Sequence, residues 1–212
     1  LEPNLVQNLE GGPALVHTGP FGNIAHGNSS VVADQIALGL ADYVVTESGF
    51  AADLGAEKFM DIKCRVSGLE PDCAVLVASV RALKAHSGRF AIAPGKPLDP
   101  ALMREDLESL ALGMGNLVKH VENLKIFGVP VVVAVNAFET DTEREHACVC
   151  EQAMRAGADA AVTHNAMAWG GPGAAALATA VVEACERPHQ FRFLYPLEAS
   201  IGEKIATVAT RI

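Results

Sequence analysis

The chain has 212 residues, with 16 Lys and Arg against 25 Asp and Glu, and its net charge of −9 comes without the basic cluster that nucleic-acid binding requires. Half of the residues are hydrophobic and only 5% are aromatic, a composition that favours buried strands covered by helices of small residues. The apolar runs are too short to cross a bilayer and the five cysteines follow no zinc or redox spacing, so we expect a cytoplasmic protein with reduced thiols and neither membrane nor nucleic acid as a partner.

Short apolar runs alternate with helical patterns along the chain. The runs that predict strands are residues 14–17, 43–46, 74–79, 129–136 and 158–163. Apolar residues at helical spacing, with capping residues before them, predict helices over residues 32–40, 107–124, 143–156, 177–185 and 201–212. Apolar strands separated by helices predict an α/β fold, a mostly parallel sheet with helices on both faces.

Two regions interrupt this alternation. Residues 88–100 contain three prolines and two glycines and predict a surface loop or insertion. The stretch from Pro188 onward indicates a linker into the last helix. We therefore expect residues 1–187 to form an α/β region, and residues 188–212 to be a linker and the start of a further helix or domain. The chain begins without Met and ends inside a predicted helix, as an internal piece of a longer protein would.

Ligands of parallel sheets bind beyond the carboxyl ends of the strands, so the segments that follow the predicted strands are candidate sites. Residues 16–30 are rich in Gly, Ser, Asn and His, and Gly19, Asn23 and His26 are candidates for lining a site; a glycine-rich loop with capping side chains is the equally balanced alternative. No GxxxxGK[ST] phosphate-binding loop occurs in the sequence. Residues 46–65 carry seven charged side chains interleaved with Gly and Phe, which modestly favours a lining role over a solvated face.

The other three segments contain cations and aromatic residues. Arg81 and Lys84 directly follow a predicted buried strand, where cations suit phosphate or carboxylate; an exposed strand–helix junction would look the same. After the next strand, Asn136 and Asp141 could read a purine edge, by analogy with P-loop proteins, and Phe138 could stack on a flat heterocycle or merely cover the core.

The only tryptophan, Trp169, precedes Gly170-Gly171-Pro172-Gly173 at the end of the last predicted strand. A lone Trp is more often a packing residue, but its place beside a flexible loop at a strand end favours a ligand platform.

Taken in this order, the five segments resemble those of formate–tetrahydrofolate ligases. The matching stretches are residues 19–27, 41–59, 80–88, 132–142 and 169–173, and the similarity runs across nearly the whole chain. The resemblance implies ATP-dependent ligation of formate to tetrahydrofolate through formyl phosphate, giving 10-formyltetrahydrofolate for one-carbon metabolism. It also implies a cytoplasmic homotetramer of multi-domain, P-loop NTPase-like subunits that uses ATP with Mg²⁺ and is activated by a monovalent cation. The P-loop of such an enzyme is not in this chain, so we expect the isolated chain to be inactive.

Residue by residue, the match assigns Phe138 and Trp169 to the pterin of tetrahydrofolate and gives Arg81 and Lys84 catalytic roles. Three departures stand out: Ser87 replaces a glycine, residues 88–100 are longer than in compact members, and counting back from the Gly-Gly pair puts Met167 rather than Trp169 at the aromatic position. The alternatives are a non-catalytic folate-binding module or a subunit completed by a partner chain that carries the phosphate loop. A bifunctional parent with a dehydrogenase/cyclohydrolase domain is also open.

Overall fold

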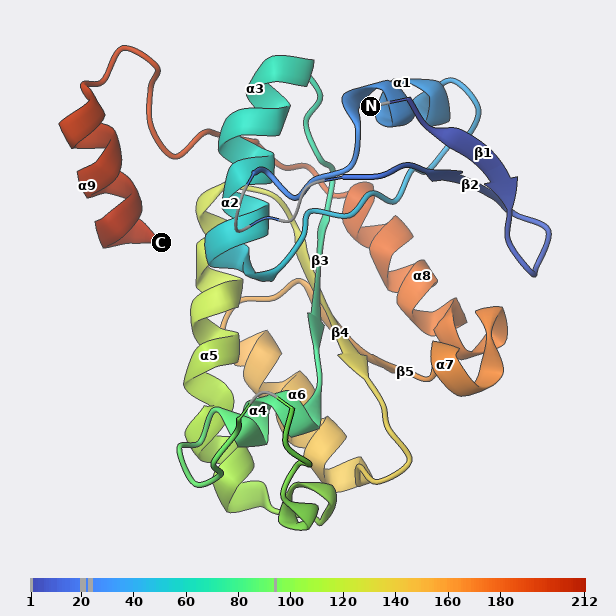
Figure 1. Cartoon of the computed structure of the whole chain (residues 1–212), viewed down its shortest axis with the longest axis vertical. Helices are drawn as coiled ribbons and strands as arrows, with labels where there is room; N and C mark the ends of the chain where they lie inside the picture. Colours follow the sequence, from blue (N-terminus) through green and yellow to red (C-terminus); the bar gives the residue numbers. More distant parts are fainter. Residues whose placement is uncertain (1, 20–21, 23–24, 94) are drawn as a thin grey trace. The chain divides into compact units, whose positions relative to one another are not determined.

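The computed structural model describes residues 2–19, 22, 25–93 and 95–212, and its contacts divide them into two compact units: residues 71–192, and residues 1–70 with 193–212 (Figure 1). The unit of residues 71–192 contains the strands β3 (Ala74–Ala78), β4 (Val131–Asn136) and β5 (Ala160–His164). Its helices are α4 (Val80–Ala85), α5 (Leu107–Ile126), α6 (Glu143–Arg155), α7 (Ala166–Trp169) and α8 (Gly171–Cys185), with a 3-10 turn at Pro100–Met103.

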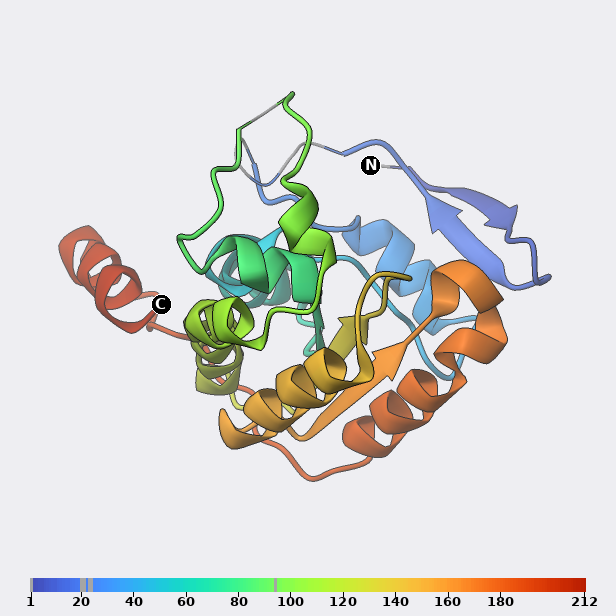
Figure 2. The ribbon, with the colours of Figure 1, turned by 90° about the horizontal axis from the view of Figure 1, so that it is seen from below.

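The three strands of this unit are parallel, in the order β3-β4-β5. Helices α5 and α6 pack on one face of the sheet, whereas α8 packs on β4 and β5 from the other; Figure 2 shows α6 and α8 on opposite sides of β5. The prediction of a parallel α/β sheet with helices on both faces is therefore confirmed. Because all three strands run the same way, their carboxyl ends meet at one edge of the sheet.

The core of this unit lies between β4 and the helices α5 and α6. Val133 and Val135 are fully buried and pack against Leu117 of α5 and Val149 of α6. Burying side chains of this size stabilises the fold by roughly 1.5–3 kcal/mol each. The predicted stripe of apolar residues on α5 is confirmed, and the helix begins after Asp106, whose Oδ1 accepts a hydrogen bond from the Ser109 N–H at 2.9 Å. The sheet thus has a rigid centre from which the loops at its carboxyl edge project.

The strand β3 is less covered than β4. Its side chains alternate, as those of any strand do, so that Leu76 faces the core while Val77 on the other face is 66% exposed. Val75, which shares the face of Val77, is 41% exposed.

The unit of residues 1–70 and 193–212 holds a two-stranded antiparallel sheet and several helices. Its elements are β1 (Asn4–Gln7), β2 (Pro13–Val16), α1 (Val31–Leu38), α2 (Ala56–Lys58), α3 (Cys64–Ser67), α9 (Ile201–Arg211) and π-helical turns at Ala51–Gly55 and Phe59–Lys63. A buried ion pair joins Lys63 to Asp34, with 2.5 Å between Nζ and Oδ2. The predicted last helix is present as α9, capped by Ser200.

In this unit one strand prediction is wrong, and a second predicted strand is present but lies outside the parallel sheet. Residues 43–46 form no strand, because they have no partner strand among the described residues. The nearest backbone hydrogen bond to another described segment is donated by the Ser29 N–H to the Glu47 carbonyl, at 3.2 Å. A β-branched run favours an extended chain, but a strand also needs a partner along its length. Residues 14–17 do contribute a strand, β2, but it pairs antiparallel with β1 and not within the parallel sheet.

Candidate functional site

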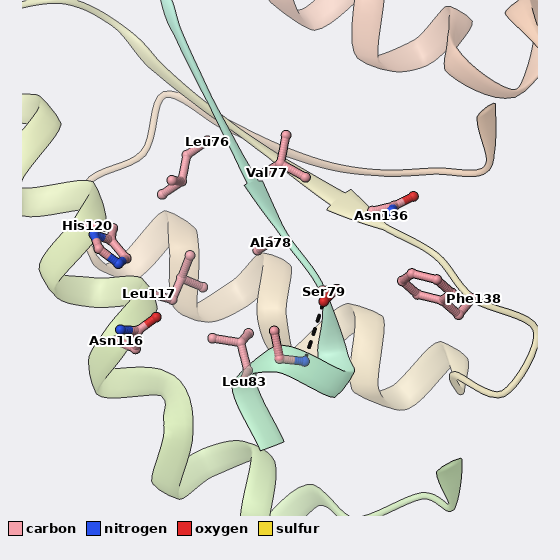
Figure 3. A pocket seen from close by; sticks show the side chains of 11 residues that line it. Leu76, Val77, Ala78, Ser79, Leu83, Asn116, Leu117, His120, Asn136 and Phe138 are labelled. Atoms are coloured by element: carbon pink, nitrogen blue, oxygen red, sulfur yellow. Dashed lines mark hydrogen bonds between the residues drawn. The ribbon is translucent and has the colours of Figure 1, made fainter. Parts of the chain in front are cut away.

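A pocket of about 200 Å³ lies at the carboxyl end of β3, in the unit of residues 71–192 (Figure 3). Its floor is apolar, from Leu76, Leu83 and Leu117, and its rim carries polar groups. Figure 3 shows Asn136 and Phe138 at one end and Asn116 and His120 of α5 at the other. The remaining lining residues are Val77, Ala78, Ser79 and Ala82. An apolar hollow with a few polar groups at the edge of a parallel sheet is the usual form of a small-molecule site.

The Arg81 guanidinium stacks on the ring of Phe138. Helix α4 starts directly after β3, with the Ser79 hydroxyl accepting the Ala82 N–H at 3.4 Å, and this puts Arg81 in its first turn. The guanidinium carbon lies 4.3 Å from the centroid of the Phe138 ring, which is 40% exposed. Within the described ranges, the guanidinium makes no hydrogen bond or ion pair. Stacking uses only its face, so its N–H groups are available to an anion.

Lys84 lies one helical turn after Arg81 but points into the interior. Its side chain is 1% exposed, its Nζ lies 2.7 Å from Glu145 Oε1, and it also donates to the Arg104 carbonyl at 2.8 Å. Glu145 is 0% exposed. Burial raises the pKa of Glu145, but hydrogen bonds from Lys84 and from the backbone N–H groups of Asp106 and Thr142 outweigh it, so the pKa is lowered. The ammonium predicted to meet an anion at the strand end is paired inside the fold.

The loop after β4 shapes the other side of the stack. The Phe138 N–H donates to Asp141 Oδ2 at 3.0 Å, and the Asp141 N–H donates to the Phe138 carbonyl at 3.0 Å. The same carboxylate oxygen lies 3.4 Å from His146 Nε2. Of the two residues predicted to contact a nucleotide, Asn136 lines the pocket, whereas the buried Asp141 carboxylate closes the loop that carries Phe138.

Trp169 follows β5, the neighbour of β4. Asn136 pairs with His164 in the register of these strands, so the loops carrying Phe138 and Trp169 leave the same edge of the sheet. Trp169 is 69% exposed and Met167 is 92% exposed, so either side chain is open to a ligand. A glycine is required at Gly173, because a Cβ there would lie 2.3 Å from the Asn165 carbonyl oxygen.

The glycine-rich loop of residues 16–30 belongs to the other unit. Gly19 and His26 are exposed there, and Asn23 lies outside the described residues. The Lys58 ammonium donates to the Ala25 carbonyl at 2.8 Å and to the Gly22 carbonyl. Of the charged side chains of residues 46–65, Lys58 therefore has a structural role, because it holds the backbone of the glycine-rich loop.

Several polar residues near the candidate pocket were not predicted from the sequence. Asn116 and His120 line it, and His120 Nδ1 is buried without a hydrogen-bond partner in the described part of the chain. They stand four positions apart on α5 and so lie on one side of the helix, next to the apolar stripe; this spacing of two polar residues is the signal that could have found them. Residues 2–19, 22, 25–93 and 95–212 contain no group of three or more His, Cys, Asp or Glu side chains placed to hold a metal ion. None of the helices described is long and apolar enough to span a membrane.

The sequence was compared with known families and proteins. The family model described as formate–tetrahydrofolate ligase matches residues 1–212. A formate–tetrahydrofolate ligase of Roseiflexus sp. (strain RS-1) is 58% identical over 212 residues, which are 100% of this chain and 38% of that protein. One of Saccharopolyspora erythraea is 55% identical over 100% of this chain and 37% of its own length, and one of Aeromonas hydrophila is 55% identical over 98% and 36%. The chain thus spans less than two fifths of the length of these relatives.

Proposed function

The chain belongs to the formate–tetrahydrofolate ligase family, and from this we propose that it forms the folate-facing part of an enzyme that joins formate to tetrahydrofolate with consumption of ATP. The product would be 10-formyltetrahydrofolate and the intermediate formyl phosphate. The observation that carries the proposal is the stack of Arg81 on Phe138 at the carboxyl edge of the sheet, which puts a cation with no hydrogen-bond partner among the described residues beside an exposed aromatic ring.

In the proposed reaction, Phe138 offers its ring to the pterin, and Trp169 offers a second aromatic face. The N10 nitrogen of tetrahydrofolate attacks the formyl carbon of formyl phosphate, the carbon–oxygen bond to phosphate breaks, and N10 loses its proton. Negative charge grows on the carbonyl oxygen and then on the departing phosphate. The free N–H groups of Arg81 are the described donors best suited to stabilise that charge. Holding the pterin on Phe138 beside Arg81 would supply the positioning on which such a transfer depends.

Only two residues of this chain, Asn136 and Asp141, support the nucleotide part of the proposal. Asn136 would contact the purine from the pocket rim, with Asp141 fixing the loop beside it. We assign the phosphates of ATP to residues outside these 212, because no GxxxxGK[ST] loop occurs in the sequence. The described residues present no fitting ligand cluster, so Mg²⁺ and the monovalent cation are assigned to no residue here. A cytoplasmic location and a homotetrameric enzyme are further parts of the proposal.

A second candidate function is a folate-binding module or subunit completed by a partner chain that carries the phosphate loop. The absence of that loop from the sequence favours it equally. Mixing the chain with the amino-terminal part of a relative distinguishes the two: restored formyltetrahydrofolate synthesis indicates a complementing subunit, and saturable folate binding without synthesis indicates the module.

Tetrahydrofolate should quench the fluorescence of Trp169, the single tryptophan of the chain, if this residue lies beside the pterin. Phe138→Ala should weaken tetrahydrofolate binding several-fold, because stacking on an aromatic face contributes about 0.5–1.5 kcal/mol beyond area burial. Titration followed by fluorescence and by calorimetry measures both effects. Phe193→Ala is the matched control, since Phe193 is also a partly exposed ring under an arginine, with 3.8 Å between the Arg65 guanidinium carbon and its centroid.

Two results would change the assignment. Saturable binding without quenching, together with weaker binding by Met167→Ala and unchanged binding by Trp169→Phe, would give the second position to Met167. An undiminished affinity in Phe138→Ala would remove Phe138 from the folate site.

A further inference from the structure

We propose that Lys84 and Glu145 are positioning residues, whose buried ion pair holds the ring of Phe138 against the guanidinium of Arg81. The proposal rests on the proposed function in one respect only, that the ring held in this way binds the pterin. In this proposal Lys84 does not contact an anion directly; it acts on the site through Glu145 and the loop after β4.

The first half of the argument is the path from Lys84 to Arg81. Both belong to α4, a helix of six residues, and they stand three positions apart. Any shift or rotation of α4 therefore moves both side chains together. Lys84 is anchored at its tip, since Nζ lies 2.7 Å from Glu145 Oε1 and 2.8 Å from the Arg104 carbonyl oxygen. This anchor fixes the helix that carries Arg81.

The second half is the path from Glu145 to Phe138. Glu145 Oε2 accepts the Thr142 N–H at 3.0 Å and the Thr142 hydroxyl at 3.3 Å, so the carboxylate holds the first turn of α6. Thr142 follows Asp141, whose carboxylate accepts the Phe138 N–H at 3.0 Å. Glu145 therefore lies two hydrogen-bonded steps from the residue that carries the ring.

These contacts form a closed circuit. It runs from Arg81 along α4 to Lys84, across the ion pair to Glu145, and back through the loop to Phe138, which contacts Arg81. Removing the ion pair breaks this circuit at its only link between oppositely charged side chains. The pair is almost completely buried, so solvent does not screen it. A capping box needs Glu or Gln at this position of α6 but does not need Lys84. The lysine is thus an addition to the cap that connects the cap to α4.

The test measures the stack directly, in the chain of 212 residues. The Arg81 guanidinium carbon lies over the Phe138 ring, 4.3 Å from its centroid, so the neighbouring Nε–H proton should show an upfield ring-current shift by NMR. Phe138→Leu defines the position of this resonance without the ring, and Arg81→Lys identifies it by its loss. The test variants are Glu145→Gln, which keeps the capping residue but removes the charge, and Lys84→Met/Glu145→Gln, which leaves no unpaired buried charge and is expected to fold.

The expected result is that both test variants move the Arg81 resonance towards its position in Phe138→Leu while circular dichroism and the melting profile show a folded chain. Lys125→Met is the matched control. Lys125 also pairs with a carboxylate, Asp159, at 2.8 Å, but this pair lies where β5 begins, at the opposite edge of the sheet. The control should leave the resonance in place. An unchanged Arg81 shift in either folded test variant overturns the proposal.

A second measurement separates this proposal from the folate assignment. Calorimetry with tetrahydrofolate should show the same several-fold loss of affinity in Lys84→Met/Glu145→Gln as in Phe138→Ala. If the variants move the Arg81 resonance but the unaltered chain does not bind tetrahydrofolate, the positioning role stands and the folate assignment to this chain fails. If the chain binds tetrahydrofolate but the variants do not move the resonance, the folate assignment stands and the positioning role fails.

Discussion

Arg81→Ala should lower the kcat of formyltetrahydrofolate synthesis about 100-fold or more, the scale observed when one electrostatic stabiliser is removed from an active site. The measurement requires an enzyme in which these 212 residues are completed by the rest of the family polypeptide. Arg81 has no other described partner than the Phe138 ring, so its N–H groups are available for charge that develops on formyl phosphate. Because that charge is larger in the transition state than in the bound substrates, kcat should fall more than the tetrahydrofolate KM rises.

Two variants test the specificity of this result. Arg81→Lys keeps the charge but loses the planar fork, and should recover only part of the rate. Arg144→Ala removes an exposed arginine of α6 that pairs with Glu105 at 2.6 Å, and should leave kcat near its normal value. Turnover close to normal in Arg81→Ala would make Arg81 an ordinary residue at the junction of β3 and α4.

The parallel sheet could be predicted because its strands carry their signal in the sequence itself. The first five residues of β4, 131–135, are a continuous run of apolar residues, as expected for a strand buried on both faces, and the Thr142 capping box marks the start of the next helix. Segment 43–46 has a similar β-branched composition, but no described strand pairs with it. Pairing depends on residues distant in sequence, and a local pattern does not contain them.

The candidate site was predictable by position but not by the direction of its side chains. Both Arg81 and Lys84 follow β3, and no local pattern distinguishes the role of one from that of the other. The structure separates them because the partner of Lys84, Glu145, is 61 positions away and fits against α4 only when β4 and α6 are in place. The same holds for the stack of Arg81 on Phe138. Residue type and strand order predict where chemistry gathers, whereas burial and pairing decide which of two similar cations remains available.

Lys84→Met should destabilise the chain by about 3–5 kcal/mol at neutral pH, because removal of one partner leaves the Glu145 carboxylate buried without its counter-charge. Urea unfolding followed by circular dichroism measures this free energy of unfolding. Lys125→Met breaks an ion pair that is partly exposed to solvent, and should cost about 1 kcal/mol or less.

The pH dependence of this loss distinguishes an unpaired charge from a simple packing defect. In the unaltered chain the pKa of Glu145 lies below its usual 4.5, so the stability that its ionised form contributes is present above pH 4.5 and is lost as the pH falls through the lowered pKa. In Lys84→Met, burial without the lysine raises this pKa, and the sign reverses: the folded state favours protonated Glu145, and stability falls as the pH rises through the raised pKa. The difference in unfolding free energy between the two proteins should therefore shrink as the pH is lowered towards 4. Glu145→Gln has no carboxyl group to titrate and should lack this convergence. A loss in Lys84→Met that is the same at pH 4 and pH 7 would indicate a packing defect, and Glu145 would then not depend on Lys84 for its charge.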